Sequence, residues 1–192
     1  MSKQLYNDIT FFHPGLSELE LAAYDGLQAA QKLAHETATN AGWYIDPETG
    51  KPIERNFGEV IALMHSELSE ALEADRKNKR RDDKLPHRGA VEVEFSDGII
   101  RILDTAAANR IDVASVFVPC LRHMATFGDL PKRLPGHDQC AVNFANTIIR
   151  ILEVSQVRGD AQAGSILDKN AFNRTRIDHQ LANRQAEGGK RY

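Results

Sequence analysis

The sequence predicts an all-α protein, organised as a multihelical bundle. Apolar residues recur at helical spacing through several long segments, and residues that cap helices precede those segments. No segment of useful length alternates apolar and polar residues in the way a half-buried strand does. The 192-residue chain is 42% hydrophobic and 27% charged, a composition typical of globular proteins, so we expect a single all-α domain over residues 1–192.

Three long helices are predicted in the first half of the chain. Ser17 and Glu20 have the spacing of a capping box, and the helix that they begin should span residues 17–41, where a glycine follows. An asparagine cap predicts a second helix over 56–77. The third is expected over 90–109, after a polar connection that contains proline and glycine.

The second half is predicted to hold three more helices. Asp112 is expected to cap a fourth helix, which Pro119 should kink or end. A loop rich in proline and glycine occupies 126–138 and separates it from a fifth helix over 139–157. A sixth helix should begin at Gly159 or Asp160 and run to about residue 176.

The third predicted helix carries an unusual polar line. Its two flanking stripes are apolar, which indicates a helix that is largely buried. Between the stripes lie Glu94, Asp97, Arg101 and Asp104. We therefore expect this line to face an enclosed polar space.

Two pairs of carboxylates stand out on the second and third helices. Glu67 and Glu70 form one pair and Glu94 and Asp97 the other, each with the i, i+3 spacing that places both side chains on one helix face. Spacing alone more often indicates surface charge balanced by nearby lysines. However, the short connection makes the two helices antiparallel neighbours, and four converging carboxylates need cations. Mg²⁺ is the expected cation, because it prefers oxygen ligands.

Two other metal sites fit the sequence poorly. A ferritin-like di-iron site needs Glu-x-x-His pairs, and none of the seven histidines has a glutamate three positions before it. A zinc deaminase needs His-x-Glu followed by Pro-Cys-x-x-Cys. His65 and Glu67 supply the first half, but His123 occupies the position of the last cysteine.

Cationic and aromatic residues offer a second, weaker signal. Lys169, Asn173 and Arg176 are spaced to share one face of the sixth helix, which is either exposed or binds phosphate. The basic segment 76–89 also has two interpretations: it is either a solvated loop or a segment that lies near phosphates. Trp43 could stack on a base or fill a core edge. The sequence contains neither a Walker A loop nor G-x-G-x-x-G, so those phosphate sites are not expected.

Charge and cysteine content restrict the partners. The formal net charge of −3 gives no overall attraction to nucleic acid or to anionic membranes, so neither is expected as a partner. No apolar run approaches the 18 residues of a membrane span, and residues 1–15 lack the hydrophobic region of a signal peptide. Cys120 and Cys140 are expected to be free thiols. These features predict a cytoplasmic protein.

The acidic pairs and their surroundings resemble a known family. E-x-x-E followed by E-x-x-D is similar to the signature of the all-α NTP pyrophosphohydrolases, the MazG-like superfamily. The context LMHSELSEALEA (63–74) and EFSDGIIRILDTAAANRID (94–112) resembles phage and bacterial members. KNAFNRTR (169–176) and GGKRY (188–192) resemble the closing K-x-x-Y-N-x-x-R…GGK segment, with Phe172 where tyrosine is usual. Between these motifs the chain carries extra residues, an expected helical insertion at about 113–160 that could reshape the substrate pocket or the oligomer interface.

The resemblance implies a Mg²⁺-dependent enzyme that hydrolyses a nucleoside triphosphate to the monophosphate and pyrophosphate and so removes unwanted nucleotides. Mn²⁺ is the implied substitute for Mg²⁺. The implied catalytic and metal-binding residues are Glu67, Glu70, Glu94 and Asp97, with Glu67 as our choice of general base. The implied substrate-binding residues are Lys169, Asn173, Arg176 and Lys190. Members of the superfamily complete their bundles by oligomerisation, which implies a homodimer or homotetramer.

Two alternatives remain at this stage. One is a related pyrophosphohydrolase with another substrate, either dUTP or dCTP or a phosphoribosyl-ATP-like molecule. The other is a helical oligomer that binds nucleotide, or a protein partner, without catalysis. The complete acidic quartet argues against the second alternative, because a protein without catalysis need not keep all four carboxylates.

Overall fold

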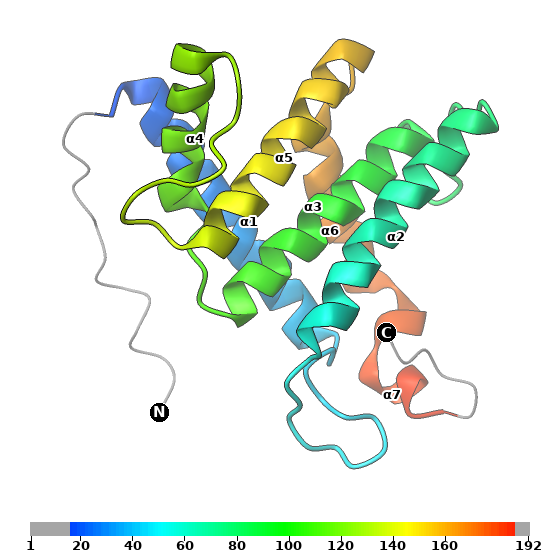
Figure 1. Cartoon of the computed structure of the whole chain (residues 1–192). Coiled ribbons are helices and arrows are strands. Elements are labelled where there is room, and N and C mark those ends of the chain that lie inside the picture. Colours follow the sequence, from blue (N-terminus) through cyan, green and yellow to red (C-terminus); the bar gives the residue numbers. More distant parts are fainter. Residues whose placement is uncertain (1–15, 187–192) are drawn as a thin grey trace.

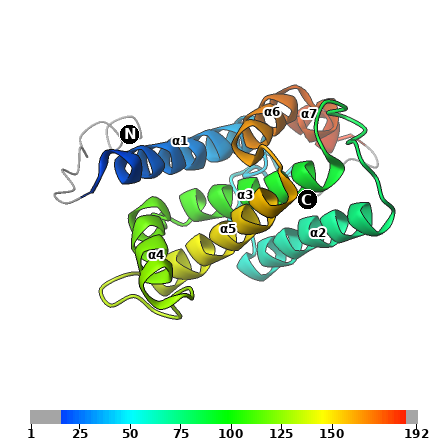
Figure 2. The same ribbon diagram turned by 90° about the horizontal axis from the view of Figure 1, so that it is seen from above.

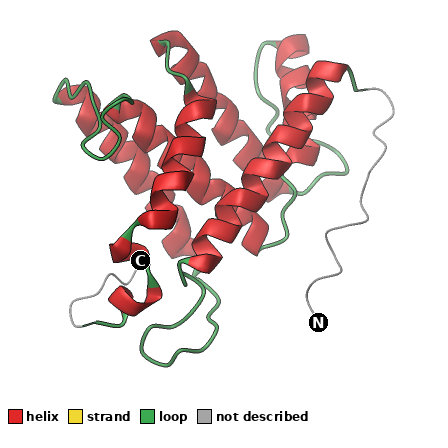
Figure 3. Ribbon diagram, turned by 180° about the vertical axis from the view of Figure 1, so that it is seen from behind, coloured by secondary structure: helices red, strands yellow, loops and turns green. Residues whose placement is uncertain are grey.

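The computed structural model describes residues 16–186 and consists of helices joined by loops, with no strand in that range (Figures 1 and 3). The prediction of an all-α fold is therefore confirmed. An isolated β-bridge joins Ile45 and Pro52 in the loop between α1 and α2. The helices are α1 (Glu18–Asn40), α2 (Phe57–Arg76), α3 (Ala90–Ala108), α4 (Ala114–Phe127), α5 (Gln139–Arg158), α6 (Gln162–Thr175) and α7 (Leu181–Arg184), with a 3₁₀ turn η1 (Ile177–His179) before α7.

Helix α3 is the centre of the molecule. It contacts α1, α2, α5 and α6, and the view from above shows it between α1 and α6 on one side and α2 and α5 on the other (Figure 2). Val93, Ile99 and Leu103 are almost completely buried, as expected for a helix that is apolar on two sides. The main hydrophobic core draws buried side chains from α1 to α5 around it.

The predicted starts of α1 and α2 are confirmed by their hydrogen bonds. The Ser17 hydroxyl accepts a bond from the Glu20 backbone N–H while the Glu20 carboxylate accepts one from the Ser17 backbone, which is the complete capping box. The Asn56 side chain likewise accepts a bond from the backbone N–H of Glu59. These caps satisfy N–H groups that have no partner within the helix.

The second half differs from the prediction in three places. Pro119 lies inside α4 and does not end it, which leaves a kink as the remaining predicted effect; buried residues on both sides of the proline belong to the helix that packs on α5. Gly159 adopts a left-handed conformation (φ 78°) and closes α5, so α6 begins later than predicted, at Gln162. The segment after α6 contains η1 and α7, where no helix was predicted. The N-cap of α4 is Val113 and not Asp112 as predicted, although the Asp112 carboxylate, one residue earlier, accepts a bond from the Ser115 backbone N–H.

A buried polar seam joins α6 to α3 and α5. The Gln162 side-chain amide donates to the Ser96 hydroxyl and to the Glu92 carbonyl, and its oxygen accepts from the Ser155 hydroxyl. The Ser96 hydroxyl bonds in turn to that of Ser165, and both serines are 0% exposed. Because each buried polar atom depends on the others for a partner, the seam fixes the position of α6 relative to α3.

Replacing Gln162 by leucine is expected to lower the free energy of unfolding by about 2 kcal/mol, since it leaves the buried Ser96 and Ser155 hydroxyls without this partner. Chemical denaturation measures the change. Gln156→Leu is a suitable control, because the Gln156 side chain is exposed on α5. Equal stability of the Gln162 variant and the wild type would show that the seam does not anchor α6.

Among the described residues, no helix combines the length and the apolar character needed to cross a membrane.

Candidate metal and nucleotide site

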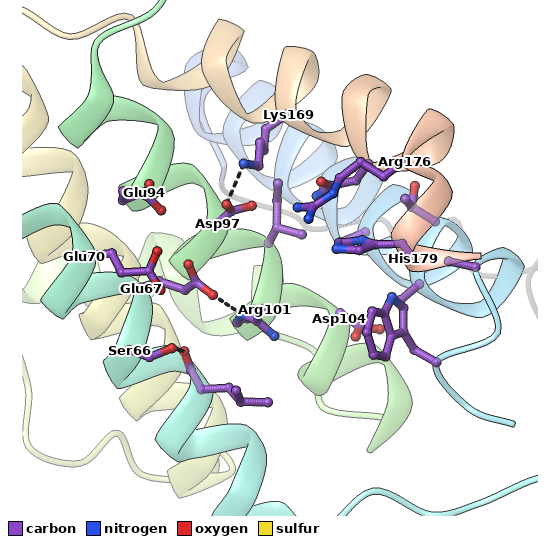
Figure 4. A pocket seen from close by; sticks show the side chains of 18 of the residues that line it. Ser66, Glu67, Glu70, Glu94, Asp97, Arg101, Asp104, Lys169, Arg176 and His179 are labelled. Atoms are coloured by element: carbon purple, nitrogen blue, oxygen red, sulfur yellow. Dashed lines mark hydrogen bonds and ion pairs between the residues drawn. The ribbon is translucent and has the colours of Figure 1, made fainter. Parts of the chain in front are cut away.

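A cavity of about 330 Å³ opens where α1, α2, α3 and α6 meet, next to the loop that follows α1. The four members of the polar line on α3 all face it, so the predicted enclosed polar space is present. In Figure 4 the acidic residues Glu67, Glu70 and Glu94 lie at one end, and Asp104 and His179 lie at the other. Side chains of α6 form the wall opposite α3.

Three of the four predicted carboxylates converge at the acidic end. Glu67 and Glu70 come from α2 and Glu94 from α3, and one carboxylate oxygen of each lies within 4.8 Å of the others. The antiparallel packing of α2 on α3 produces this arrangement, as predicted from the short connection between them. Oxygen atoms at these separations could hold a divalent cation.

The fourth carboxylate, Asp97, lines the same cavity but lies outside that trio. Its carboxylate pairs instead with Lys169 Nζ at 2.8 Å. Across the site, Arg101 Nε pairs with Glu67 at 2.5 Å. Two of the four carboxylates are thus each paired with one cation, and the six groups together carry a formal charge of −2. One divalent cation would balance that charge.

The pKa values of two of the carboxyl groups reflect this excess of negative charge. The pKa of Glu67 is raised overall, mainly by burial. The positive charge of Arg101 lowers this pKa, whereas the negative charges of Asp97 and Glu70 raise it. Burial, followed by repulsion from Asp97 and Glu70, raises the pKa of Glu94 from 4.5 to about 7. At neutral pH the site without a cation is therefore electrostatically unfavourable.

In a metal chelator, the stability of the protein is expected to fall as the pH rises from about 5 to about 7. Glu94 binds its proton more tightly in the folded state (pKa about 7) than in the unfolded state, so folding is favoured below this window and loses about 2 kcal/mol across it. Thermal unfolding at a series of pH values measures the loss. Glu94→Gln should remove it, and Mg²⁺ should restore stability above pH 7. A slope that persists in Glu94→Gln would assign the effect to other groups.

The cationic residues predicted on α6 also face the cavity. Lys169 is 3% exposed, and Asn173 and Arg176 lie one and two turns further along the same wall. The Phe172 ring lies beneath both cations, 5.7 Å from Lys169 Nζ and 5.8 Å from the Arg176 guanidinium. Arg176 also pairs with Asp178, which orients its guanidinium. Lys190, the remaining predicted substrate-binding residue, lies outside the described residues.

The structure adds residues that sequence spacing did not single out. Lys84, from the basic segment between α2 and α3, lines the cavity and makes no ion pair within residues 16–186. Arg55 lines it from the loop after α1. The basic composition of 76–89 was the only signal for Lys84, and one of the two interpretations of that segment placed it near phosphates. Arg55 had no comparable signal.

Trp43 forms part of the cavity wall but is covered by other side chains. The Arg184 guanidinium lies over its ring at 4.0 Å, and the His179 ring packs against its edge at 5.3 Å. Arg184 also donates a hydrogen bond to the Gly42 carbonyl at 2.6 Å. These contacts favour the interpretation of Trp43 as a packed residue over that of an open stacking platform.

The segment 113–160 contributes no residue to the cavity. Helices α4 and α5 pack against each other, α4 also contacts α1, and α5 also contacts α3. Their buried side chains belong to the main core. The extra length therefore extends the core away from the cavity, and the expected reshaping of the pocket is not seen in its lining.

Comparisons of the chain with protein-family models, with curated proteins and with solved structures found no match.

Proposed function

We propose that this protein is a Mg²⁺-dependent nucleoside triphosphate pyrophosphohydrolase of the MazG-like type, which converts a (d)NTP and water into the (d)NMP and pyrophosphate. The observation that carries the proposal is the convergence of Glu67, Glu70 and Glu94 in a cavity whose opposite wall is cationic. Such a cavity suits a ligand that combines a divalent cation with phosphates. A nucleotide hydrolase of this kind would work in the cytoplasm, where its substrates are made.

The residues present fit Mg²⁺. Glu70 and Glu94 would hold it, and Asp97 would join them if Lys169 turned from its carboxylate to a phosphate, while Glu67 would lie beside the ion as the general base. The uncompensated formal charge and the raised pKa of Glu94 are the features expected of a site built for a cation. When bound, Mg²⁺ supplies charge neutralisation at the phosphates and lowers the pKa of a bound water.

The other groups of the cavity would position the substrate. Lys169 and Arg176 would bind the phosphates, with Arg176 able to make paired hydrogen bonds. Glu67 would accept a proton from the attacking water, because burial raises the pKa of its carboxyl and so makes it a stronger base. Arg101 would hold the Glu67 carboxylate in place through their ion pair. Attack at the α-phosphorus then releases pyrophosphate.

Pyrophosphate release from a panel of canonical and modified (d)NTPs tests the proposal. We expect turnover with Mg²⁺ or Mn²⁺, none with EDTA, and loss of turnover in Glu70→Gln. Folded protein that binds Mg²⁺ but hydrolyses none of the panel would indicate a phosphoribosyl-ATP-like substrate or a binding function. Turnover that is unaffected by Glu70→Gln would contradict the proposed site.

We also propose that the protein assembles as a homodimer or homotetramer. Leu72 on α2 is 50% exposed and Val157 on α5 is 91% exposed, and these two helices are linked by the ion pair between Asp75 and Arg158. Sedimentation analysis should give the mass of an oligomer, and Val157→Glu should shift it toward the monomer because it places a charge in the apolar contact. A monomeric wild type would contradict this proposal.

A further inference from the structure

The end of the cavity opposite the acidic trio contains a separate buried carboxylate. Asp104 is 7% exposed and lines the cavity from α3. It lies ten residues beyond Glu94 on the same helix, about 15 Å along the axis at the usual rise per residue. That span is comparable with the length of a nucleotide from its phosphates to the outer edge of its base. Figure 4 shows Asp104 and the acidic trio at opposite ends of the cavity.

One oxygen of Asp104 is fixed by two donors. The Tyr44 hydroxyl donates to Oδ1 at 2.8 Å, and His35 Nδ1 lies 2.9 Å from the same oxygen. The rings of His35 and Tyr44 pack edge to face, with centroids 5.1 Å apart, which holds both donors in place. Burial, and then the charge of Asp104, raises the pKa of Tyr44, so its hydroxyl stays protonated and remains a donor.

The other oxygen, Oδ2, is available to a ligand. It accepts no hydrogen bond from residues 16–186, and it is not among the buried side-chain atoms that lack a partner, so it is accessible from the cavity. No lysine or arginine in the described part of the chain forms an ion pair with Asp104. An oriented carboxylate that offers one free oxygen acts as a hydrogen-bond acceptor toward whatever enters.

From this geometry we propose that Asp104 is a specificity-determining residue, which selects nucleotides whose base carries an exocyclic amino group. The proposal rests on the proposed function, because it treats this end of the cavity as the place for the base. Cytosine presents its 4-amino group as a donor to Oδ2. Uracil presents a carbonyl there, and the carbonyls beside its N3–H repel a carboxylate that approaches from that edge.

Asn173 lines the same cavity and has a buried amide oxygen without a hydrogen-bond partner. The amide group of Asn173 can rotate to present either a donor or an acceptor, so it can bind a carbonyl group or an amino group of a base equally well. A carboxylate has only acceptors while it is ionised. Discrimination between amino and carbonyl groups is therefore assigned to Asp104.

The substitution Asp104→Asn tests the proposed role of Asp104 in base selection. The neighbouring side chains determine how the new amide group is oriented. Tyr44 and His35 donate to Oδ1, so the amide oxygen should remain on their side and the amide nitrogen should replace Oδ2. The shape is kept while the acceptor becomes a donor. The variant should therefore prefer the carbonyl of uracil.

Equilibrium binding of dCTP and dUTP, measured by calorimetry with Ca²⁺ in place of Mg²⁺ to prevent turnover, gives the preference. The wild type should bind dCTP at least about tenfold more tightly, and Asp104→Asn should reverse this by a similar factor. Tyr44→Phe should weaken the preference without reversing it. Asp25→Asn, at an exposed position on α1, should leave it unchanged. Thermal unfolding of each variant checks that it is folded.

Equal affinity of the wild type for the two nucleotides, no binding of either, or an unchanged preference in folded Asp104→Asn would overturn the inference. Measuring pyrophosphate release from the same pair separates it from the proposed function. A preference that reverses in binding without any pyrophosphate release would uphold the role of Asp104 and reject the enzymatic activity. Pyrophosphate release with no dCTP preference would uphold the enzymatic activity and reject the role of Asp104.

Discussion

Replacing Glu94 by glutamine is expected to reduce pyrophosphate release by roughly 10²- to 10³-fold while making the metal-free protein more stable. The loss of activity follows from the position of Glu94 in the trio that is proposed to hold the cation. The gain in stability follows from its pKa of about 7, because at pH 8 the folded protein must keep an unfavourable negative charge beside Asp97 and Glu70. Glutamine keeps the shape and removes that charge, which should add about 1 to 2 kcal/mol to the free energy of unfolding at pH 8.

Both effects can be measured on one preparation, by pyrophosphate release in Mg²⁺ and by chemical denaturation in EDTA. Glu36→Gln is the matched control, since Glu36 belongs to an exposed pair with Lys32 on α1. It should change neither quantity appreciably. A Glu94→Gln variant that is less stable than the wild type would contradict the electrostatic account, and one that keeps full activity would contradict the metal site.

The second large effect is expected for Lys169→Met, which should lower kcat/KM by about 10²-fold and the free energy of unfolding by about 3 kcal/mol. The stability loss arises because Asp97 would lose its only ion-pair partner among the described residues, in a largely buried position. The activity loss arises because Lys169 would no longer reach a phosphate. Lys32→Met, at the exposed position on α1, is the control.

Asp97→Asn separates the two roles of Lys169. In that background the buried negative charge is absent, so the stability cost of Lys169→Met should shrink by at least half. The activity cost should persist if Lys169 contacts the substrate. If the activity cost disappears together with the stability cost, Lys169 acts only by holding Asp97, and the phosphate-binding role is wrong.

The helices could be predicted because their signals are local. Ser17 with Glu20 and the asparagine cap at residue 56 mark helix starts through contacts within one turn, and the structure forms those contacts. The exceptions depend on packing. The continuation of α4 through Pro119 is decided by buried neighbours that contact α5, and no local pattern reports them.

The same distinction applies to the candidate site. The convergence of Glu67, Glu70 and Glu94 follows from spacing within helices and one short connection, so it was accessible from the sequence. The environment of Asp104 could not be predicted from the sequence, because His35 and Tyr44 lie 69 and 60 residues away from it in the chain. The pairing of Asp97 with Lys169 spans a similar distance and appears only when α6 docks on α3.

The most direct test of the account is to run the reaction in H₂¹⁸O with Mg²⁺ and a nucleoside triphosphate that is turned over, and to analyse the products by mass spectrometry. If water attacks the α-phosphorus as proposed, nucleoside monophosphate and pyrophosphate should form in equal amounts, with the ¹⁸O in the monophosphate. Formation of nucleoside diphosphate and labelled inorganic phosphate would contradict it, as would ¹⁸O found in the pyrophosphate.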